Sequence, residues 1–367
     1  MKTVPNQRLL YSLCGPIAGA CRTWPDCSDT AFQETCNPTK PNLSRPTAIA
    51  ILLTLFIMGG WCCAYGQASL RPVTFMPQWI PQAQFAGYMV AQEKGFYREA
   101  GLDVTHLTGG PGKNCFASLA AEETTFCTGW LSTAILQRAA GLRLVNLAQM
   151  IQRSSLLLVA KKSSGIREPK DIENKRVGFW VGDFDAPGLF FLKKHNLRVQ
   201  VIPNYTTVTV FLTGAVDAVA AMWYNEYHTI LNCGFNPDEL SVLKFADTGV
   251  NFPEDGLYCS EEMFASDPEA CLAFAEASLK GWKHAFDHPD ETIEIVMRHA
   301  RDANTGTNVA HQRWMLAAMK DLMTPDGNDE VFGRLSEEDY RRVSEALKEV
   351  NLIREIPEYT KFYRGPR

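Results

Sequence analysis

Short apolar runs alternate with stretches of helical periodicity from Val73 to Asn232, and this alternation constrains the fold more than any other feature of the chain. In the first unit, the run Val73–Met76 precedes apolar residues at spacings of three and four, which predict a helix over Gln82–Glu93. Strands separated by helices of about ten residues are typical of parallel βαβ units. The sequence therefore predicts an α/β protein.

The remaining expected elements alternate between strand and helix up to Asn232, and helices alone are expected after Cys259. Further strands are expected at Asp103–Leu107, Thr124–Thr128, Leu142–Ala148, Leu156–Ala160, Arg176–Trp180, Val199–Pro203 and Ala215–Met222. The helices between them are expected at Asn114–Glu122, Leu131–Ala140, Ala186–His195, Thr206–Thr213 and Tyr224–Asn232. After Cys259 the pattern is wholly helical, with helices expected at Pro268–His288, Pro289–Arg301, Asn308–Met323 and Ser336–Glu349.

Composition narrows the class of protein. The chain has 367 residues, of which 46% are hydrophobic and 21% charged, and this balance suits a globular protein with a sizeable core. Its length favours two domains. The net charge of −5, without a basic stripe interleaved with aromatic residues, argues against nucleic acid as a partner. The sequence has no paired Cys-x-x-Cys motif, and we predict neither a metal site nor catalytic residues.

An uncharged apolar run, Ala48–Tyr65, follows Arg45 and precedes small residues around Ala68. This order is typical of a secretory signal peptide, so we expect residues 47–68 to be a signal peptide cleaved near Ala68 or, failing cleavage, a membrane anchor. Residues 1–46 have no sustained period and are interpreted as an unstructured extension, or as the product of a start codon assigned too early. We therefore expect an exported protein in the periplasm or a similar extracytoplasmic space.

Two stretches resemble a known family. The phrase A-x-E-K-G-F-Y-x-x-x-G-L-D-V over Ala91–Val104, and the run Asp217–His228, resemble the periplasmic binding proteins related to thiamine pyrimidine synthases. The resemblance implies a two-lobed fold of type II, in which each lobe is a mainly parallel sheet flanked by helices, with a helical C-terminal tail. We place lobe 1 at residues 69–160 and lobe 2 at residues 161–250. Residues 251–367 return to lobe 1 and form the tail.

Four groups of aromatic residues follow expected strands, where ligands gather in open α/β sheets. They are Trp79, Trp130, Trp180 and the group Trp223, Tyr224, Asn225 and Glu226. A single tryptophan at such a place belongs to the core by default, whereas four indicate a cleft for a flat ring. The expected ligand-binding residues are Trp79, Gln84, Tyr88, Trp130, Trp180, Asp183, Trp223, Tyr224, Asn225 and Glu226.

Glu226 is the strongest single candidate. The family resemblance implies an acidic residue after an aromatic one at the cleft, and a carboxylate there can accept hydrogen bonds from an amino-substituted ring. From spacing alone, Glu226 would be a solvated carboxylate in the first turn of a helix.

The related synthases hold a cofactor phosphate in a loop that corresponds to Gly182–Asp185, where the carboxylate of Asp185 would repel phosphate. They also carry a lysine that binds pyridoxal phosphate and a histidine consumed as substrate. In this chain, Gly129 and Thr133 occupy those two positions, and glycine cannot form a Schiff base. We therefore expect no cofactor. Pyridoxal phosphate and iron would be required only if the chain were a synthase.

The sequence predicts the solute-binding component of an ABC importer, a monomer that closes around an unphosphorylated flat heteroaromatic such as a thiamine-precursor pyrimidine. Its partners would be that small molecule and an ABC permease. One alternative is a thiamine pyrimidine synthase that consumes its own histidine. Another is a receptor for riboflavin or an aromatic sulfonate.

Overall fold

The computed structural model describes residues 69–366 with the exception of residues 181, 183 and 206. The expected N-terminal extension and the expected signal peptide or anchor lie outside the described residues. Residues Gln67–Arg367 form one compact unit. In the described part of this unit, none of the helices has the length and apolar character needed to cross a membrane.

The first sheet, sheet A, has five strands in the order β2-β1-β3-β10-β4. They are β1 (Arg71–Met76), β2 (Leu102–His106), β3 (Phe126–Trp130), β4 (Leu144–Gln149) and β10 (Asp255–Ser260). β1 runs parallel to β2 and β3, whereas β10 runs antiparallel to β3 and β4. All residues of β3 and β4 are buried, which requires cover on both faces of the sheet.

Sheet B repeats this plan with the order β7-β6-β8-β5-β9. Its strands are β5 (Leu156–Lys161), β6 (Arg176–Trp180), β7 (Gln200–Asn204), β8 (Ala218–Met222) and β9 (Leu240–Lys244). β6 runs parallel to β7 and β8, and β5 is the reversed strand, antiparallel to β8 and β9. Each sheet is thus mainly parallel, as predicted, with one reversed strand.

The chain passes between the sheets twice, from β4 to β5 and from β9 to β10. The first lobe was expected to end at residue 160, so that the polar stretch Lys161–Glu173 would begin the second lobe. In the structure β5 already belongs to sheet B, and the polar stretch forms two short 3-10 helices, η2 (Lys162–Ser164) and η3 (Pro169–Ile172). Polar, proline-containing sequence marks a surface connection but does not reveal which sheet it serves.

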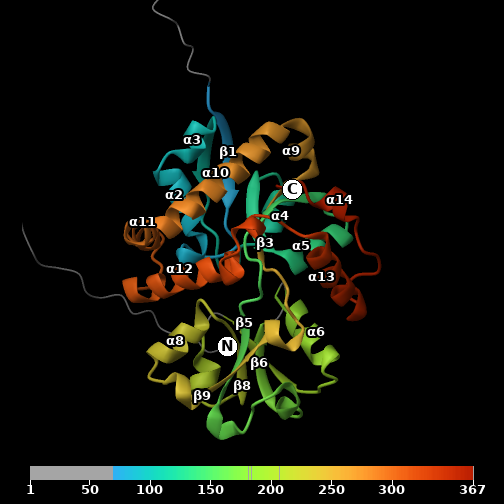
Figure 1. Cartoon of the computed structure of the whole chain (residues 1–367). Helices are drawn as coiled ribbons and strands as arrows, with labels where there is room; N and C mark the ends of the chain where they lie inside the picture. The colour runs from blue at the N-terminus through green and yellow to red at the C-terminus, as the bar shows by residue number, and fades with distance from the viewer. Residues whose placement is uncertain (1–68, 181, 183, 206, 367) are drawn as a thin grey trace, which may run out of the picture. The chain divides into compact units, whose positions relative to one another are not determined.

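Helices connect the strands near the predicted places (Figure 1). They are α2 (Ala86–Glu93), preceded by the 3-10 turn η1 (Ala83–Phe85), α3 (Phe96–Glu99), α4 (Cys115–Ala120), α5 (Leu131–Ala139), α6 (Ala186–Lys194), α7 (Thr209–Leu212) and α8 (Glu226–Asn232). Tyr88 of α2 is buried and stacks on Phe75 of β1, with ring centroids 4.6 Å apart. The apolar stripe of α2 therefore faces sheet A.

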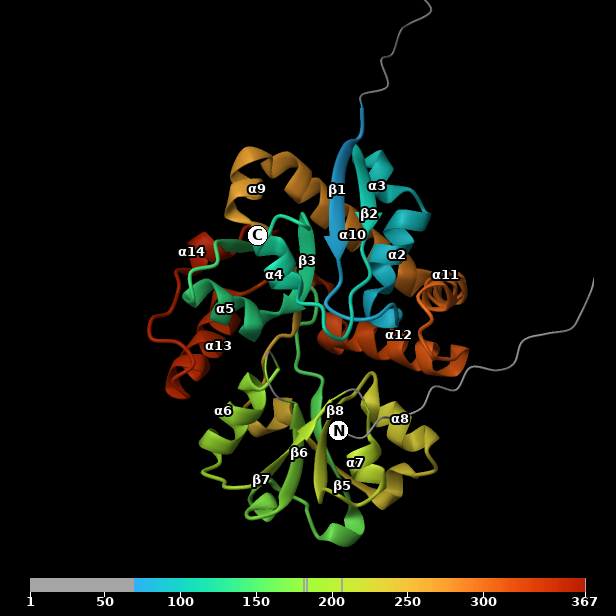
Figure 2. The same ribbon diagram turned by 180° about the vertical axis from the view of Figure 1, so that it is seen from behind.

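The C-terminal region is helical, as predicted, and returns to sheet A (Figures 1 and 2). Its helices are α9 (Glu261–Ser266), α10 (Pro268–Asp287), α11 (Pro289–Asp302), α12 (Val309–Met323), α13 (Glu337–Glu349) and α14 (Tyr359–Phe362). The helices α10 and α13 begin close to the expected places, where the side chains of Asp267 and Ser336 each accept a backbone N–H of the first turn. Trp282 of α10 is fully buried beside Tyr88.

Trp314 of α12 is not part of the buried core. It is partly exposed, and its ring stacks on His228 of α8 with centroids 4.9 Å apart. Its Nε1 donates to the carbonyl oxygen of Trp223 over 3.2 Å. The tail therefore binds the sheet B side of the molecule as well as sheet A.

Candidate functional site

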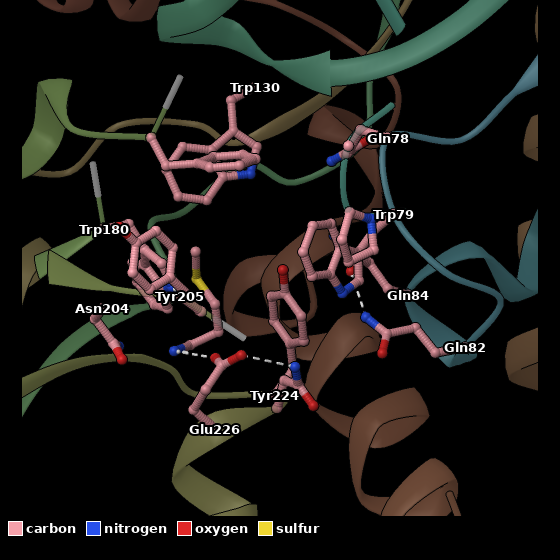
Figure 3. Close-up of a pocket in the computed structure, with 15 residues that line it drawn as sticks. Gln78, Trp79, Gln82, Gln84, Trp130, Trp180, Asn204, Tyr205, Tyr224 and Glu226 are labelled. Atoms are coloured by element: carbon pink, nitrogen blue, oxygen red, sulfur yellow. Dashed lines mark hydrogen bonds between the residues drawn. The ribbon is translucent and has the colours of Figure 1, made fainter. Parts of the chain in front are cut away.

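A cavity of ≈270 Å³ lies where strands of both sheets end at their carboxyl termini (Figure 3). Trp130, Trp180, Asn204 and Met222 are the last residues of β3, β6, β7 and β8, and all four line it. Trp79 follows β1 and lines it as well. The topology places these residues together, because parallel strands end at the same edge of a sheet.

Aromatic rings form most of the wall. Figure 3 shows Trp130, Trp79 and Trp180 on different sides of the space, with Tyr224 between them. Trp130 packs edge-to-face on Phe184, with centroids 4.7 Å apart, and the Trp180 Nε1 donates to the Tyr205 carbonyl oxygen over 2.9 Å. Rings fixed in this way offer faces for stacking without further loss of side-chain freedom on binding.

Glu226 begins α8 and lines the cavity. One carboxylate oxygen accepts the Met222 N–H over 2.9 Å, and the other accepts the Asn225 Nδ2 over 2.8 Å. Burial raises the pKa of Glu226, although these hydrogen bonds oppose the shift. A carboxylate has about four lone-pair sites, so Glu226 keeps some acceptor capacity for a ligand.

A second carboxylate, Asp255, lies behind the wall at the start of β10. Its Oδ1 accepts the Gln78 Nε2 over 2.6 Å, and its Oδ2 accepts the Gln84 Nε2 over 2.7 Å. The Oε1 of Gln84 in turn accepts the Gln82 Nε2 over 2.7 Å. Burial raises the pKa of Asp255 to about 6, against the effect of the two amide donors. Asp255 is therefore mainly ionised at neutral pH and binds two amides of the cavity wall directly, and Gln82 through Gln84.

Glu254, the residue before Asp255, connects the crossover that leads into β10 with the crossover that leads into β5. Glu254 accepts hydrogen bonds from the Ser155 N–H, over 2.7 Å, and from the hydroxyls of Ser154 and Ser155. Burial, with a smaller contribution from Asp255, raises its pKa to about 8. Ser155, the residue before β5, is thus bound to the carboxylate of Glu254, the residue before β10. Glu254 is 3% exposed.

Two histidines join α8 to α12 beside the cavity. The Nδ1 atoms of His228 and His311 are 3.0 Å apart, and the His311 Nε2 is 2.9 Å from the Asn225 Oδ1. Because the Asn225 Nδ2 donates to Glu226, its Oδ1 must accept from His311. Neutral His311 then has its lone pair on Nδ1, and the His228 Nδ1 that faces it also lies 3.1 Å from the Asn232 Nδ2, a donor. Burial lowers the pKa of both histidines.

The predicted binding residues fall into three groups. Seven line the cavity, namely Trp79, Gln84, Trp130, Trp180, Tyr224, Asn225 and Glu226. Two do not line it. Tyr88 packs in the core against Phe75. Trp223 lines a separate hollow, together with residues next to β5 and β9, and contacts Trp314. Asp183 lies outside the described residues.

Sequence reasoning missed several polar residues of the wall. Gln78 stands next to Trp79, and Asn204 ends β7, so both follow the strand-end rule that was applied to aromatic residues. Gln82 belongs to the turn before α2. Asp255 had no local signal, because its position depends on β10 pairing between β3 and β4.

The glycine-rich loop after β2 borders the cavity through Pro111 and Gly112. A Cβ atom at Gly109 would lie 1.9 Å from the Pro77 carbonyl oxygen, so only glycine allows this loop to approach the end of β1. Two adjoining cavities of ≈440 and ≈610 Å³ share Trp79 and Pro111 with the first. A ligand larger than one ring has room to extend.

The residues present do not fit pyridoxal phosphate bound as in the synthases. A Cβ atom at Gly129 would lie 2.4 Å from the Phe116 ring, so the place of a lysine side chain is filled. Thr133, at the histidine position, lines the ≈440 Å³ cavity. Among the described residues, no group of three or more His, Cys, Asp or Glu side chains could hold a metal ion.

Two sheets linked by two crossovers, with a cavity at their strand ends, define the class of periplasmic binding protein folds. The periplasmic aliphatic sulphonate binding protein SsuA from Escherichia coli has this fold, with a TM-score of 0.62 and 16% identity over 82% of this chain and 94% of that chain. The predicted two-lobed fold is thereby confirmed. The chain belongs to the NMT1/THI5-like family, whose model matches residues 82–292, more than half of its length.

Two relatives with assigned functions are similar over most of the chain. The riboflavin-binding protein RibY of Chloroflexus aurantiacus is 26% identical over 262 residues, 68% of this chain and 72% of RibY. The formylaminopyrimidine-binding protein of Halalkalibacterium halodurans is 23% identical over 270 residues, 70% of this chain and 79% of that protein. The resemblance stated from the sequence is confirmed at the level of the family.

Proposed function

We propose that this protein is the extracytoplasmic solute-binding component of an ABC importer and binds an unphosphorylated flat heteroaromatic, such as a thiamine-precursor pyrimidine. The observation that carries the proposal is the cavity itself, in which Trp79, Trp130, Trp180 and Tyr224 surround a space that Glu226 also borders. Stacking faces and one carboxylate suit a ring with an amino group. The names of the two relatives support both the role and the ligand class.

The charges of the wall support an uncharged or cationic ligand over an anionic one. Among the described residues, the ≈270 Å³ cavity has no lysine or arginine in its lining. The adjoining ≈440 Å³ cavity has Lys113, whose ammonium group donates to the Thr108 carbonyl oxygen. Sulfonates and phosphates are usually bound by cations or clustered N–H donors. An aromatic sulfonate is therefore the less favoured ligand, and riboflavin remains the alternative with a flat ring.

We favour a binding protein over a synthase because Phe116 fills the space beside Gly129. In the proposed role the protein acts as a monomer and delivers its ligand to a membrane permease. The apolar run at Ala48–Tyr65 supports export by a signal peptide or anchor.

Calorimetric titration with four probes tests the proposal: 4-amino-2-methylpyrimidine, its phosphorylated hydroxymethyl derivative, riboflavin and an aromatic sulfonate. We expect the neutral rings to bind and the two anions to bind at least about tenfold more weakly, a difference of about 1.4 kcal/mol. Tighter binding of either anion would overturn the proposed ligand class.

Two matched variants locate the ring. Trp180→Leu removes a cavity face and should weaken binding about tenfold, the effect of losing one stacked aromatic contact. Trp223→Leu makes the same change at a tryptophan outside the cavity and should leave affinity unchanged. A larger effect at Trp223 would show that the ligand lies elsewhere.

A further inference from the structure

One face of helix α12 is attached to the cavity wall that follows β1. The Gln312 Oε1 accepts the Ala83 N–H over 2.6 Å, and Ala83 lies between the lining residues Gln82 and Gln84. One helical position further round, the Met315 Sδ accepts the Gln84 N–H over 3.3 Å. Gln312 is 1% exposed, so this attachment is buried. The first turns of α12 are therefore fixed to the sheet A side of the cavity.

The neighbouring face of α12 is attached to the sheet B side, where Figures 1 and 2 show α12 beside α8. The Nε2 of His311 donates to the Asn225 Oδ1 over 2.9 Å. Three residues later, the Nε1 of Trp314 donates to the Trp223 carbonyl oxygen, and its ring stacks on His228. Consecutive positions at the start of α12 are thus bound to the two sides of the cavity.

The Asn225 amide carries the contact from His311 to the carboxylate of Glu226. Because its Oδ1 accepts from His311, its Nδ2 faces the Glu226 Oε1 at 2.8 Å. The Glu226 Oε2 accepts the Met222 N–H over 2.9 Å, and dashed lines in Figure 3 mark both bonds of Glu226. Without a donor at Oδ1, the amide could turn its oxygen toward the carboxylate, and two acceptors repel each other. His311 therefore decides how one oxygen of Glu226 is held.

We propose that His311 is a positioning residue of the ligand site, which holds the Glu226 carboxylate in its ligand-binding orientation through the Asn225 amide. His311 lines the adjoining ≈610 Å³ cavity but not the ≈270 Å³ cavity, so it acts on the ring through Asn225 and Glu226. Since α12 is also bound to the wall after β1, the carboxylate is held relative to both sides of the cavity. The inference rests on the proposed function, in which Glu226 accepts from the ligand.

His311→Leu tests the positioning role with two rings of the same size. The first is 4-amino-2-methylpyrimidine, whose amino group can donate to Glu226, and the second is 2,4-dimethylpyrimidine, which has no N–H group. Burial lowers the pKa of His311, so its ring is mainly neutral in calorimetry at pH 7.5. Because binding must then order a loosened carboxylate, the variant should bind the amino ring about three- to tenfold more weakly. Its affinity for the dimethyl ring should stay at the wild-type value.

Two further variants serve as controls. His311→Gln keeps an N–H donor of similar reach and should retain most of the wild-type affinity for the amino ring. His288→Leu makes the same change as His311→Leu at an exposed histidine that lines none of the three cavities, and should leave both affinities unchanged. If His311→Leu melts below the assay temperature, His311→Phe, which keeps a ring against His228, takes its place.

A folded His311→Leu or His311→Phe with the wild-type affinity for the amino ring overturns the inference. An equal loss for both rings, or no recovery in His311→Gln, overturns it as well, because either result is typical of a general structural role. The wild type separates the inference from the proposed function. If it binds both rings equally, Glu226 makes no ligand contact and the inference alone is refuted. If it binds neither ring, the proposed function fails and the inference falls with it.

Discussion

Glu226 combines two roles that the sequence could only present as alternatives. It lines the cavity, as the family resemblance implied, and it also ties the end of β8 to the start of α8 through the Met222 N–H and the Asn225 side chain. Truncation to alanine would therefore loosen the turn as well as remove a ligand contact. A test of its binding role needs a side chain of the same size.

We predict that Glu226→Gln weakens binding of an aminopyrimidine by about ten- to thirtyfold, or roughly 1.4 to 2 kcal/mol, because a charged acceptor becomes a neutral one. The melting temperature of the unliganded protein should fall modestly, since the glutamine oxygen can still accept the Met222 N–H but its NH₂ group would face the Asn225 Nδ2 donor. Titration of both proteins, with melts of each, separates the two effects. Equal affinities would leave Glu226 with a structural role only.

The sequence predicted the aromatic lining and, of the polar lining, Gln84, Asn225 and Glu226, but not Gln78, Gln82 or Asn204, for a physical reason. Trp79, Trp130 and Trp180 were found because a residue at a strand end can be located from local periodicity. The same reasoning cannot tell which side of a strand end faces the cavity, so it also included Trp223. Asp255 depends on pairing between segments far apart in the chain, which no local pattern encodes.

At the scale of elements, the crossovers between the sheets depend on Glu254. Most strands were predictable because their apolar runs are bounded by turn residues, but β10 begins Asp255-Gly256 and does not read as a strand. Its position matters, since Glu254 immediately before it binds Ser154 and Ser155 immediately before β5. The two crossovers are therefore connected by hydrogen bonds to the buried carboxyl group of Glu254.

We predict that the free energy of unfolding falls by about 1.6 kcal/mol between pH 6.5 and 8 on account of Glu254. Its pKa rises from 4.5 to about 8 on folding, so in this window the folded state holds a proton that the unfolded state has lost. The stability from this proton is complete below the unfolded pKa and disappears as pH rises through about 8.

Denaturant unfolding at pH 6.5, 7.25 and 8 measures this slope. Glu254→Gln should abolish it, whereas Glu276→Gln, the same substitution at an exposed position of α10, should retain it. A steep slope that survives in Glu254→Gln would assign the proton to another group.

At the scale of the whole molecule, α12 connects the tail to the sheet B side. Trp314 stacks on His228, and His311 bonds to both His228 and Asn225. The two facing Nδ1 atoms can share one proton, but two protons would place N–H against N–H. The hydrogen bond between His228 of α8 and His311 of α12 can therefore form only while the two rings together carry at most one proton more than in their neutral forms.

We predict that this pair makes stability rise with pH in the acid range below the unfolded histidine pKa of about 6.5. Burial lowers the pKa of both histidines below the unfolded value of 6.5, so the unfolded state binds more protons in this window and the stability is lost as pH falls. His228→Asn keeps a polar atom near the Nδ1 position but does not titrate. Its stability relative to wild type should improve from pH 6.5 to 5, and an unchanged difference would refute the role of the pair.

The position of β10 also sets the order in which the chain can complete its sheets. All five strands of sheet B lie between Leu156 and Lys244, so they are available together as soon as that segment has been synthesised. Sheet A begins earlier but cannot close, because β10 must enter between β3 and β4 after sheet B has been made. On the ribosome, the lobe that starts second is the one that can finish first, and β3 and β4 wait with open edges for a strand about a hundred residues further along.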